Sequence, residues 1–192
     1  MFEINFNPFP ILQSERLSLR ALSETDVDEV FAIRSDKNIM RYIPRPLAKT
    51  KQDAMDLIVK INKKIADNEV INWAITLKGK SKMLGMICLI RMQPENYRTE
   101  VGYILHPAYQ GKGIMDEALK TVIDYAFNVL HFHSLEAVID PGNIASEKLL
   151  IKNHFVKEAH FKENEFYEGR FLDTVIYSKI NILDNVVTGS AL

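Results

Sequence analysis

The spacing of apolar residues changes several times along this chain, and the changes predict short strands interrupted by helices. Residues 17–20 alternate apolar and polar side chains, which is typical of a strand buried on one face. In the next two segments apolar residues recur at helical spacing, and each segment follows a residue that can cap a helix, Ser23 and Thr50. Because Pro44 and Pro46 interrupt the chain between them, these segments predict two separate helices.

The middle of the chain contains runs of apolar and β-branched residues separated by turn signals. Residues 70–77 and 83–90 predict two strands of a hairpin with its turn at 78–80, and residues 99–105 predict a third strand. The segment that follows contains one proline and two glycines, so it must be irregular. Residues 114–130 then carry one continuous apolar stripe, which predicts the most clearly marked helix of the chain.

The last part of the chain alternates between strand and helix patterns. Residues 135–139 predict a strand, and Asn143 is placed to cap a short helix that follows it. Residues 155–161 and 172–180 are rich in apolar and β-branched side chains, and they predict the two final strands.

The order of these segments predicts one α+β domain. Two helices come first, then an antiparallel meander, then strand, helix, strand, helix and strand, which is typical of a central sheet with helices on both faces. The chain has 192 residues, and its 47% hydrophobic and 26% charged residues are ordinary values for a globular protein. We therefore expect a single domain over residues 1–180 and a flexible tail over the polar residues 181–192.

Charge and cysteine content exclude several classes of protein. The 24 basic residues are balanced by 25 acidic residues, so neither a nucleic-acid partner nor a membrane partner is expected. The lone cysteine, Cys88, rules out a disulfide inside the chain, and the scattered histidines predict no metal site. The first residues lack the pattern of a signal peptide, and no apolar stretch approaches the about 20 residues that cross a bilayer. We expect a cytoplasmic monomer or homodimer.

The most informative stretch joins the strand at 99–105 to the helix at 114–130. It reads Gln110-Gly111-Lys112-Gly113-Ile114-Met115. Free N–H groups at a helix start attract phosphate, and glycines let a phosphate approach the backbone closely. Asp116 stands where a dinucleotide-binding loop has its third glycine, and no serine or threonine follows Lys112 as in a P-loop. The loop therefore predicts another phosphate ligand, with a plain strand-to-helix turn as the alternative.

This loop resembles the acetyl-CoA pyrophosphate loop of the GNAT N-acetyltransferases, Gln/Arg-x-x-Gly-x-Gly/Ala. Further segments resemble the ribosomal-protein alanine N-acetyltransferase branch of that family, at residues 14–20, 100–103, 115–119 and 140–150. The resemblance covers residues 10–180 and implies the GNAT fold. In that fold a central mixed, mostly antiparallel sheet has helices on both faces, and the strands at 99–105 and 135–139 splay apart to hold the cofactor.

The resemblance implies an acetyl-CoA-dependent N-acetyltransferase that acts on a primary amine. In this branch the acceptor is the N-terminal amine of a protein. The pantetheine arm would pair with the strand backbone near Ile104 and Leu105, the pyrophosphate would lie on the amides from Gly111 to Met115, and Asn143 would bond the pantetheine amides. A small-molecule amine such as a polyamine is an alternative acceptor, and a non-catalytic acyl-CoA-binding module is an alternative function.

Two side chains are candidates for the chemistry. Glu100 would accept the amine proton as the general base, and its alternative role is a solvated strand carboxylate. Leu150 stands where many family members have a tyrosine that protonates the departing thiolate. Ser146, four residues earlier, would bond or protonate that thiolate, and its alternative role is to satisfy a backbone group at the helix start. A backbone N–H near Leu105 would stabilise the oxyanion, which is worth about 3 kcal/mol for one donor.

Overall fold

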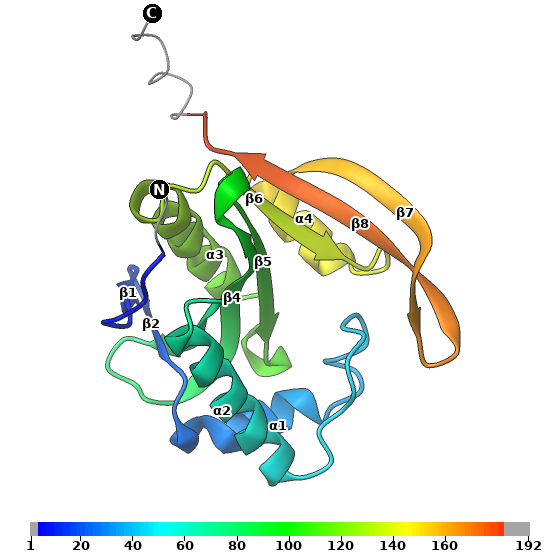
Figure 1. The fold of residues 1–192 in the computed structure, drawn as a ribbon. Helices are drawn as coiled ribbons and strands as arrows, with labels where there is room; N and C mark the ends of the chain where they lie inside the picture. The colour runs from blue at the N-terminus through cyan, green and yellow to red at the C-terminus, as the bar shows by residue number, and fades with distance from the viewer. Residues whose placement is uncertain (1–3, 183–192) are drawn as a thin grey trace, which may run out of the picture.

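Within residues 4–182, which the computed structural model describes, eight strands form one sheet (Figure 1). The strands are β1 Leu12–Gln13, β2 Leu17–Ala21, β3 Ile71–Leu77, β4 Met83–Gln93, β5 Arg98–Leu105, β6 Ser134–Ile139, β7 Val156–Tyr167 and β8 Arg170–Ile180. Their order across the sheet is β1-β2-β3-β4-β5-β6-β8-β7. Neighbouring strands are antiparallel except β5 and β6, which are parallel. The sheet is therefore mixed and mostly antiparallel, as predicted.

The connections contain both α-helices and shorter helical turns. The α-helices are α1 Val27–Arg34, α2 Lys51–Ala66, α3 Ile114–Asp124 and α4 Ile144–Lys152. Three 3₁₀ turns lie at Glu24–Asp26, Pro94–Asn96 and Pro107–Tyr109, and a π-helical turn lies at Tyr125–Val129. The segment 114–130 is thus helical as predicted, but its α-helical part ends at Asp124.

Different helices cover the two faces of the sheet. Figure 1 shows α3 and α4 on one face and α1 with α2 on the other. The period of two along β3 makes this possible, because successive side chains of a strand point to opposite faces. Trp73 and Ile75 belong to the main apolar core with Ala118 of α3, whereas Ala74 packs in a second cluster with Ile58 of α2.

The predicted caps begin the first two helices. The Thr50 hydroxyl accepts a hydrogen bond from the Asp53 N–H at 3.2 Å, and the Thr50 N–H donates to the Asp53 carboxylate at 2.9 Å. The Ser23 N–H likewise donates to Asp26 at 2.9 Å, although a 3₁₀ turn precedes α1 there. Each pair satisfies backbone groups that a helix start leaves without an internal partner.

β5 and β6 separate after a short paired stretch. They pair only from Arg98 opposite Ser134 to Glu100 opposite Glu136. From Val101 onward, β5 keeps β4 as a neighbour and has no strand on its other side. This confirms the expected splay, and the space between the diverging strands is called the gap below.

The last two strands are longer than the sequence pattern predicts. β7 and β8 continue past the predicted residues 155–161 and 172–180 into a long hairpin, in which Tyr167 lies opposite Arg170 (Figure 1). There β7 and β8 pair with each other, and most of their side chains are exposed. Because neither face of the hairpin tip is buried against a core, its sequence lacks the apolar alternation that marks a strand.

The predicted tail begins inside the folded part of the chain. Asn181 is buried, and its N–H donates to the His133 carbonyl at 2.8 Å. Residues 183–192, on which the rest of that prediction falls, lie outside the described residues.

Candidate active site

The glycine loop turns sharply from β5 into α3. Gly111 and Gly113 both have a φ of 72°, in the left-handed region that favours glycine, and Gly113 is the N-cap of α3. The N–H groups of Ile114 and Met115 have no carbonyl one turn earlier within the helix. They therefore remain available to an anion at the positive end of the helix dipole.

The side chains of Gln110 and Lys112 form hydrogen bonds with backbone carbonyls of the segment that leads into the loop. Gln110 Nε2 donates to the Leu105 carbonyl at 3.2 Å, and Lys112 Nζ donates to the Ala108 carbonyl at 2.8 Å. The Lys112 ammonium also lies over the Tyr109 ring, 5.7 Å from its centroid. Both side chains thus help to set the loop conformation, and Lys112 keeps a positive charge beside the helix start.

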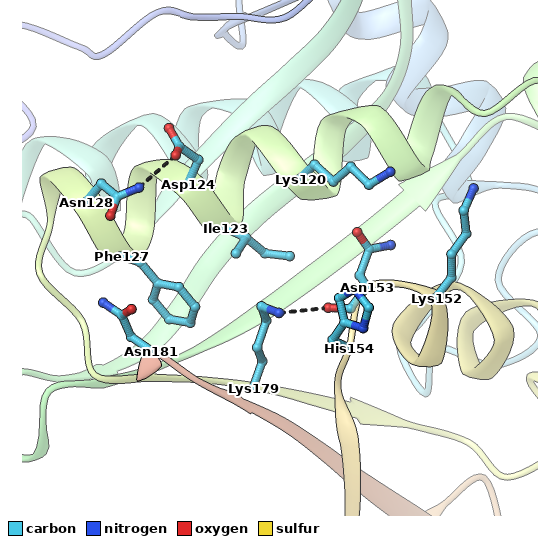
Figure 2. Close-up of a pocket in the computed structure, with 10 residues that line it drawn as sticks. All are labelled: Lys120, Ile123, Asp124, Phe127, Asn128, Lys152, Asn153, His154, Lys179 and Asn181. Carbon is cyan, nitrogen blue, oxygen red and sulfur yellow. Dashed lines mark hydrogen bonds between the residues drawn. The ribbon is translucent and has the colours of Figure 1, made fainter. Parts of the chain in front are cut away.

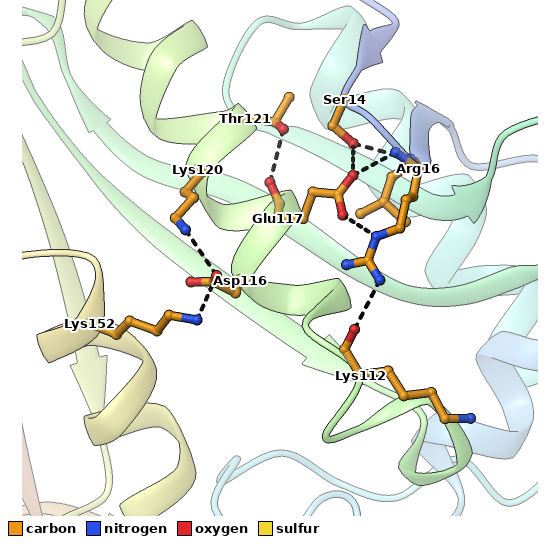
Figure 3. Close-up of polar contacts among 9 residues, drawn as sticks. Ser14, Arg16, Lys112, Asp116, Glu117, Lys120, Thr121 and Lys152 are labelled. Carbon is orange, nitrogen blue, oxygen red and sulfur yellow. Dashed lines mark hydrogen bonds and ion pairs between the residues drawn. The ribbon is translucent and has the colours of Figure 1, made fainter.

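The turn between β1 and β2 contacts this loop and the first turn of α3. Figure 3 shows Ser14 and Arg16 of the β1–β2 turn converging on the Glu117 carboxylate in the first turn of α3. Ser14 Oγ and Arg16 N donate to it at 2.7 Å each, and Arg16 Nε at 2.6 Å. Arg16 Nη1 also donates to the Lys112 carbonyl at 3.1 Å. Although burial opposes ionisation, these bonds lower the pKa of Glu117. The sequence pattern marked Arg16 as part of a strand motif and missed this contact.

Asp116 ties α3 to the end of α4. Its carboxylate accepts from Lys120 Nζ at 3.0 Å and from Lys152 Nζ at 2.9 Å (Figure 3). It also accepts from Asn153 Nδ2 at 2.8 Å. Burial opposes the charge, but the bonds from Lys152, Asn153 and Lys120 outweigh it and lower the pKa of Asp116 to about 2. The link joins the two helices that flank the gap.

A hollow of about 350 Å³ lies along the C-terminal half of α3, between that helix, the end of α4 and β8. Figure 2 shows its lining: Lys120, Ile123, Asp124, Phe127, Asn128, Lys152, Asn153, His154, Lys179 and Asn181. Burial lowers the pKa of Lys179, whose Nζ donates to the Asn153 carbonyl at 3.1 Å. None of the residues predicted for the site lines this hollow.

The register of β5 decides which peptide groups face the gap. His106 N–H donates to the Leu84 carbonyl of β4 at 3.0 Å. Because peptide groups alternate between the two sides of a strand, those of Ile104 also face β4, and those of Tyr103 and Leu105 face the gap. Of the two residues expected to pair with the pantetheine arm, Leu105 turns its peptide groups to the gap. Ile104 turns its peptide groups to β4, and its side chain packs against the cluster of α1 and α2.

Glu100 lies at the point where β5 and β6 separate. It is 8% exposed, and Arg91 Nη1 donates to its carboxylate at 2.6 Å. Burial raises the pKa of Glu100, the Arg91 guanidinium opposes this rise, and the neighbouring Glu136 adds to it. Glu136 stands opposite Glu100 in the parallel ladder and forms its own ion pair with Arg98. The alternative of a solvated strand carboxylate is therefore wrong.

Asn143 and Ser146 begin α4. Asn143 Oδ1 accepts from the Ser146 N–H at 3.1 Å, which makes Asn143 the N-cap of the helix. The amide nitrogen of Asn143 is left for another acceptor. Leu150 is fully buried in the main core, so it contributes packing and no hydrogen-bonding group near Ser146.

Tyr103 is a residue that sequence reasoning missed. Its hydroxyl oxygen is buried, and no group in residues 4–182 forms a hydrogen bond of ordinary geometry with it. Burial raises the pKa of Tyr103 to about 12, and the nearby Ser146 side chain opposes this rise. The sequence shows Tyr103 only as part of the motif at 100–103, and a tyrosine in a strand gives no local signal of a functional role.

The loop at residues 35–50, between α1 and α2, reaches the turn before α4. A Cβ atom on Gly142 would lie 3.3 Å from Tyr42 Cε1, so the loop and the turn are close neighbours. The charged residues of the loop are mainly basic: Lys37, Arg41, Arg45 and Lys49 against Asp36.

Two arginines on this side of the molecule lack an acidic partner. In the part of the chain that the structure describes, neither Arg34 nor Arg45 forms an ion pair with a carboxylate. Arg34 Nη1 has the Met40 sulfur as its acceptor, at 3.6 Å. Burial and the charge of Arg45 lower the pKa of Arg34, and Arg45 also lowers the pKa of Glu100. Arg45 therefore acts on both Arg34 and the candidate base.

Within residues 4–182, no helix is long and apolar enough to cross a membrane. The same residues contain no group of three or more His, Cys, Asp or Glu side chains that could hold a metal ion.

The sequence resemblance implies a mixed sheet in which two parallel strands splay apart, with a glycine loop that leads from the first of them into a helix. The structure has this arrangement at β5, β6 and α3. A family model described as the acetyltransferase (GNAT) domain matches residues 16–156. The chain therefore belongs to the GNAT acetyltransferases, and it is an acetyl-CoA-dependent N-acetyltransferase.

Similar proteins share the transfer reaction and differ in the acceptor that their names give. The uncharacterized N-acetyltransferase p20 of Bacillus licheniformis is 31% identical over 167 residues, which cover 87% of this chain and 94% of that protein. A spermidine N(1)-acetyltransferase of Vibrio cholerae is 26% identical over 160 residues, which cover 83% and 90%. The structure of RimL, a ribosomal L7/L12 alpha-N-protein acetyltransferase in complex with coenzyme A, matches with a TM-score of 0.79 at 21% identity. That match covers 89% of this chain and 98% of RimL and shows the same fold.

Proposed function

We propose that the acceptor is the N-terminal amine of a protein or peptide. The observation that carries this choice is the pair Arg34 and Arg45, which lack an acidic partner in the described chain. Arg45 lies close enough to Glu100 to lower the pKa of that carboxyl, and Arg34 lies close to Arg45. A polyamine carries several positive charges, and unpaired guanidinium groups at its entry disfavour it. A peptide brings carbonyl oxygens, and often carboxylates, that guanidinium groups can bind.

The coenzyme end of the site holds the phosphates and the pantetheine arm. The amides from Gly111 to Met115 bind the pyrophosphate, and Lys112 supplies a positive charge beside it. The carbonyl of Leu105 pairs with the pantetheine arm, which thereby takes the place of a missing strand neighbour. Because Asn143 Oδ1 is already occupied by the cap, Asn143 donates from its amide nitrogen to a pantetheine carbonyl.

The chemical step needs a base, an oxyanion donor and a group that handles the thiolate. Glu100 accepts the proton of the attacking amine, and its raised pKa makes it a better base than an exposed glutamate. The Leu105 N–H donates to the oxygen that becomes negative as the C–N bond forms. The C–S bond then breaks, and the Ser146 hydroxyl assists the departure of the sulfur.

A panel of amines tests the acceptor. The enzyme is incubated with acetyl-CoA and peptides that begin with Ala or Ser, and release of free thiol is followed. The same peptides with a blocked N-terminus and an internal lysine serve as matched controls, and spermidine is the competing acceptor. We expect turnover with free N-termini at least tenfold above that with spermidine. Turnover with spermidine, without turnover on any free N-terminus, would show that the acceptor is a polyamine.

A further inference from the structure

The Tyr103 hydroxyl is a buried polar group without a hydrogen bond of ordinary geometry in residues 4–182. Buried hydroxyl groups nearly always have a partner, because leaving one unpaired costs the hydrogen bond that it makes with water in the unfolded chain. An unpaired buried hydroxyl beside a ligand gap therefore points to a partner that arrives with the ligand.

The strand register places Tyr103 at the gap. Its peptide groups face the side of β5 that lacks a strand neighbour. Its side chain lies on the same face of the sheet as those of Val101 and Leu105, and it packs against the core cluster that contains Leu150 of α4. Ser146 lies one turn before Leu150, and its side chain is close enough to Tyr103 to lower that tyrosine's pKa. Tyr103 on β5 and Ser146 at the start of α4 therefore lie near each other beside the gap.

Other candidates for this position are already engaged or apolar. Leu150 has no polar atom. Tyr177, on β8 beside α4, donates its hydroxyl hydrogen to Glu147 at 2.6 Å. Tyr125 lies beyond the end of α3 and packs edge-on against Trp73. Tyr103 thus presents, on β5, a buried hydroxyl that forms no hydrogen bond of ordinary geometry with the described residues.

We propose that Tyr103 Oη is the group that donates a proton to the departing coenzyme A sulfur, with Ser146 orienting it. The proposal rests on the proposed function. As the C–S bond breaks, the sulfur takes its electron pair and accepts the Tyr103 proton. The proton that the amine gave to Glu100 passes to water, and water returns a proton to Tyr103. Tyr103 of β5 thereby supplies the proton that Leu150 of α4, which has no polar atom, cannot supply.

Titration of the thiol of bound coenzyme A tests the contact without turnover. A hydrogen bond from Tyr103 stabilises the thiolate, so the thiol pKa falls when coenzyme A binds to the parent protein. Thiolate absorbance is measured against pH for the complex, with the complex of desulfo-coenzyme A subtracted to remove tyrosine absorbance. In Tyr103→Phe we expect the bound thiol to titrate about one pH unit higher than in the parent, which is a tenfold change in the equilibrium.

Controls separate this role from packing. Tyr125→Phe removes the hydroxyl of another largely buried tyrosine, and it should leave the thiol titration unchanged. Tyr103→Phe should bind acetyl-CoA within about threefold of the parent and lower the single-turnover rate by about tenfold or more. Ser146→Ala should lower that rate by about tenfold, and the double variant should lose little more than Tyr103→Phe alone, because the two hydroxyls act together.

Several outcomes would contradict the proposal. One is a bound thiol that titrates alike in the parent and in Tyr103→Phe when both bind coenzyme A. Another is a thiol pKa in the parent complex no lower than in free coenzyme A, which needs no variant and so does not depend on the folding of Tyr103→Phe. If no amine in the acceptor panel is acetylated, this result would count against the proposed acceptor alone. The thiol titration tests the contact of Tyr103 with coenzyme A, and it needs no acceptor.

Discussion

The coenzyme end of the gap and its acceptor end are built in different ways. At the proposed coenzyme end, one continuous segment, 110–115, makes the turn into α3, and Ser14 and Arg16 hold this turn through Glu117. At the acceptor end, Glu100 of β5, Arg34 of α1 and the loop at 35–50 come together from distant parts of the chain. A phosphate site built from backbone amides is therefore determined by a few consecutive residues. A site that selects an acceptor depends instead on the packing of segments that are distant in the sequence.

The largest effect is expected at the coenzyme end, from Gly113→Val. A β-branched residue is strained at a φ of 72°, and its Cβ would lie 3.4 Å from Arg16 Nη2, so the loop proposed to bind the pyrophosphate would change its shape. Coenzyme A affinity, measured by calorimetry, should fall by about 100-fold or more. Gly79→Val is the matched control, because Gly79 has a φ of 71° and open space around it in the β3–β4 turn. Equal affinities in the two folded variants would remove this loop from the site.

At the acceptor end, Glu100→Gln should lower the rate of acetyl transfer at neutral pH by about 100-fold, with coenzyme A affinity unchanged. The folded pKa of Glu100 is raised, so the rate of the parent enzyme should fall as pH falls through that raised value. The difference from the variant should shrink at high pH, where the amine is already neutral. Glu136→Gln is the control, and an equal loss in both variants would indicate a charge effect shared by the pair.

A smaller change, confined to the acceptor, is expected from Arg34→Ala. Removing this guanidinium should raise the KM for a peptide acceptor by about tenfold and leave coenzyme A affinity unchanged. It should also improve turnover of spermidine relative to the peptide, because one positive charge is lost. Lys60→Ala, on the exposed side of α2, supplies the comparison for a change in net charge alone. An unchanged preference between peptide and spermidine would mean that Arg34 does not meet the acceptor.

The smallest effect concerns stability at the coenzyme end, from Asp116→Asn. Asp116 has its pKa lowered to about 2, below its value of about 3.9 in an unfolded chain. Its contribution is therefore present above about pH 4 and is lost as pH falls toward about 2. At neutral pH the variant should lose about 1–3 kcal/mol of unfolding free energy in urea, and the difference should vanish near pH 2. If the loss of unfolding free energy does not change with pH, then packing and not the charge of Asp116 accounts for it. Asp124→Asn, in the same helix, is the control for replacing an aspartate by asparagine.

Much of the architecture could be predicted from local patterns. The caps at Ser23 and Thr50, the strand at 17–20 and the hairpin of β3 and β4 follow from spacings of a few residues, and the structure confirms them. The tip of the β7–β8 hairpin could not be predicted in this way, because its side chains are largely exposed and its pairing is held by backbone hydrogen bonds. The short strand β1 also carries too few residues to show a period.

The sequence by itself determined the glycine loop at the start of α3, since two glycines before an apolar helix set a backbone that few other residues adopt. Only the tertiary structure decided that Leu105 and not Ile104 turns its peptide groups to the gap, because that depends on the register against β4. It alone brought Arg16 to Glu117, Arg45 into range of Glu100 and Tyr103 close to Ser146. Each of these pairs lies far apart in the chain, and a sequence pattern of a few residues carries no information about which distant strands and helices become neighbours.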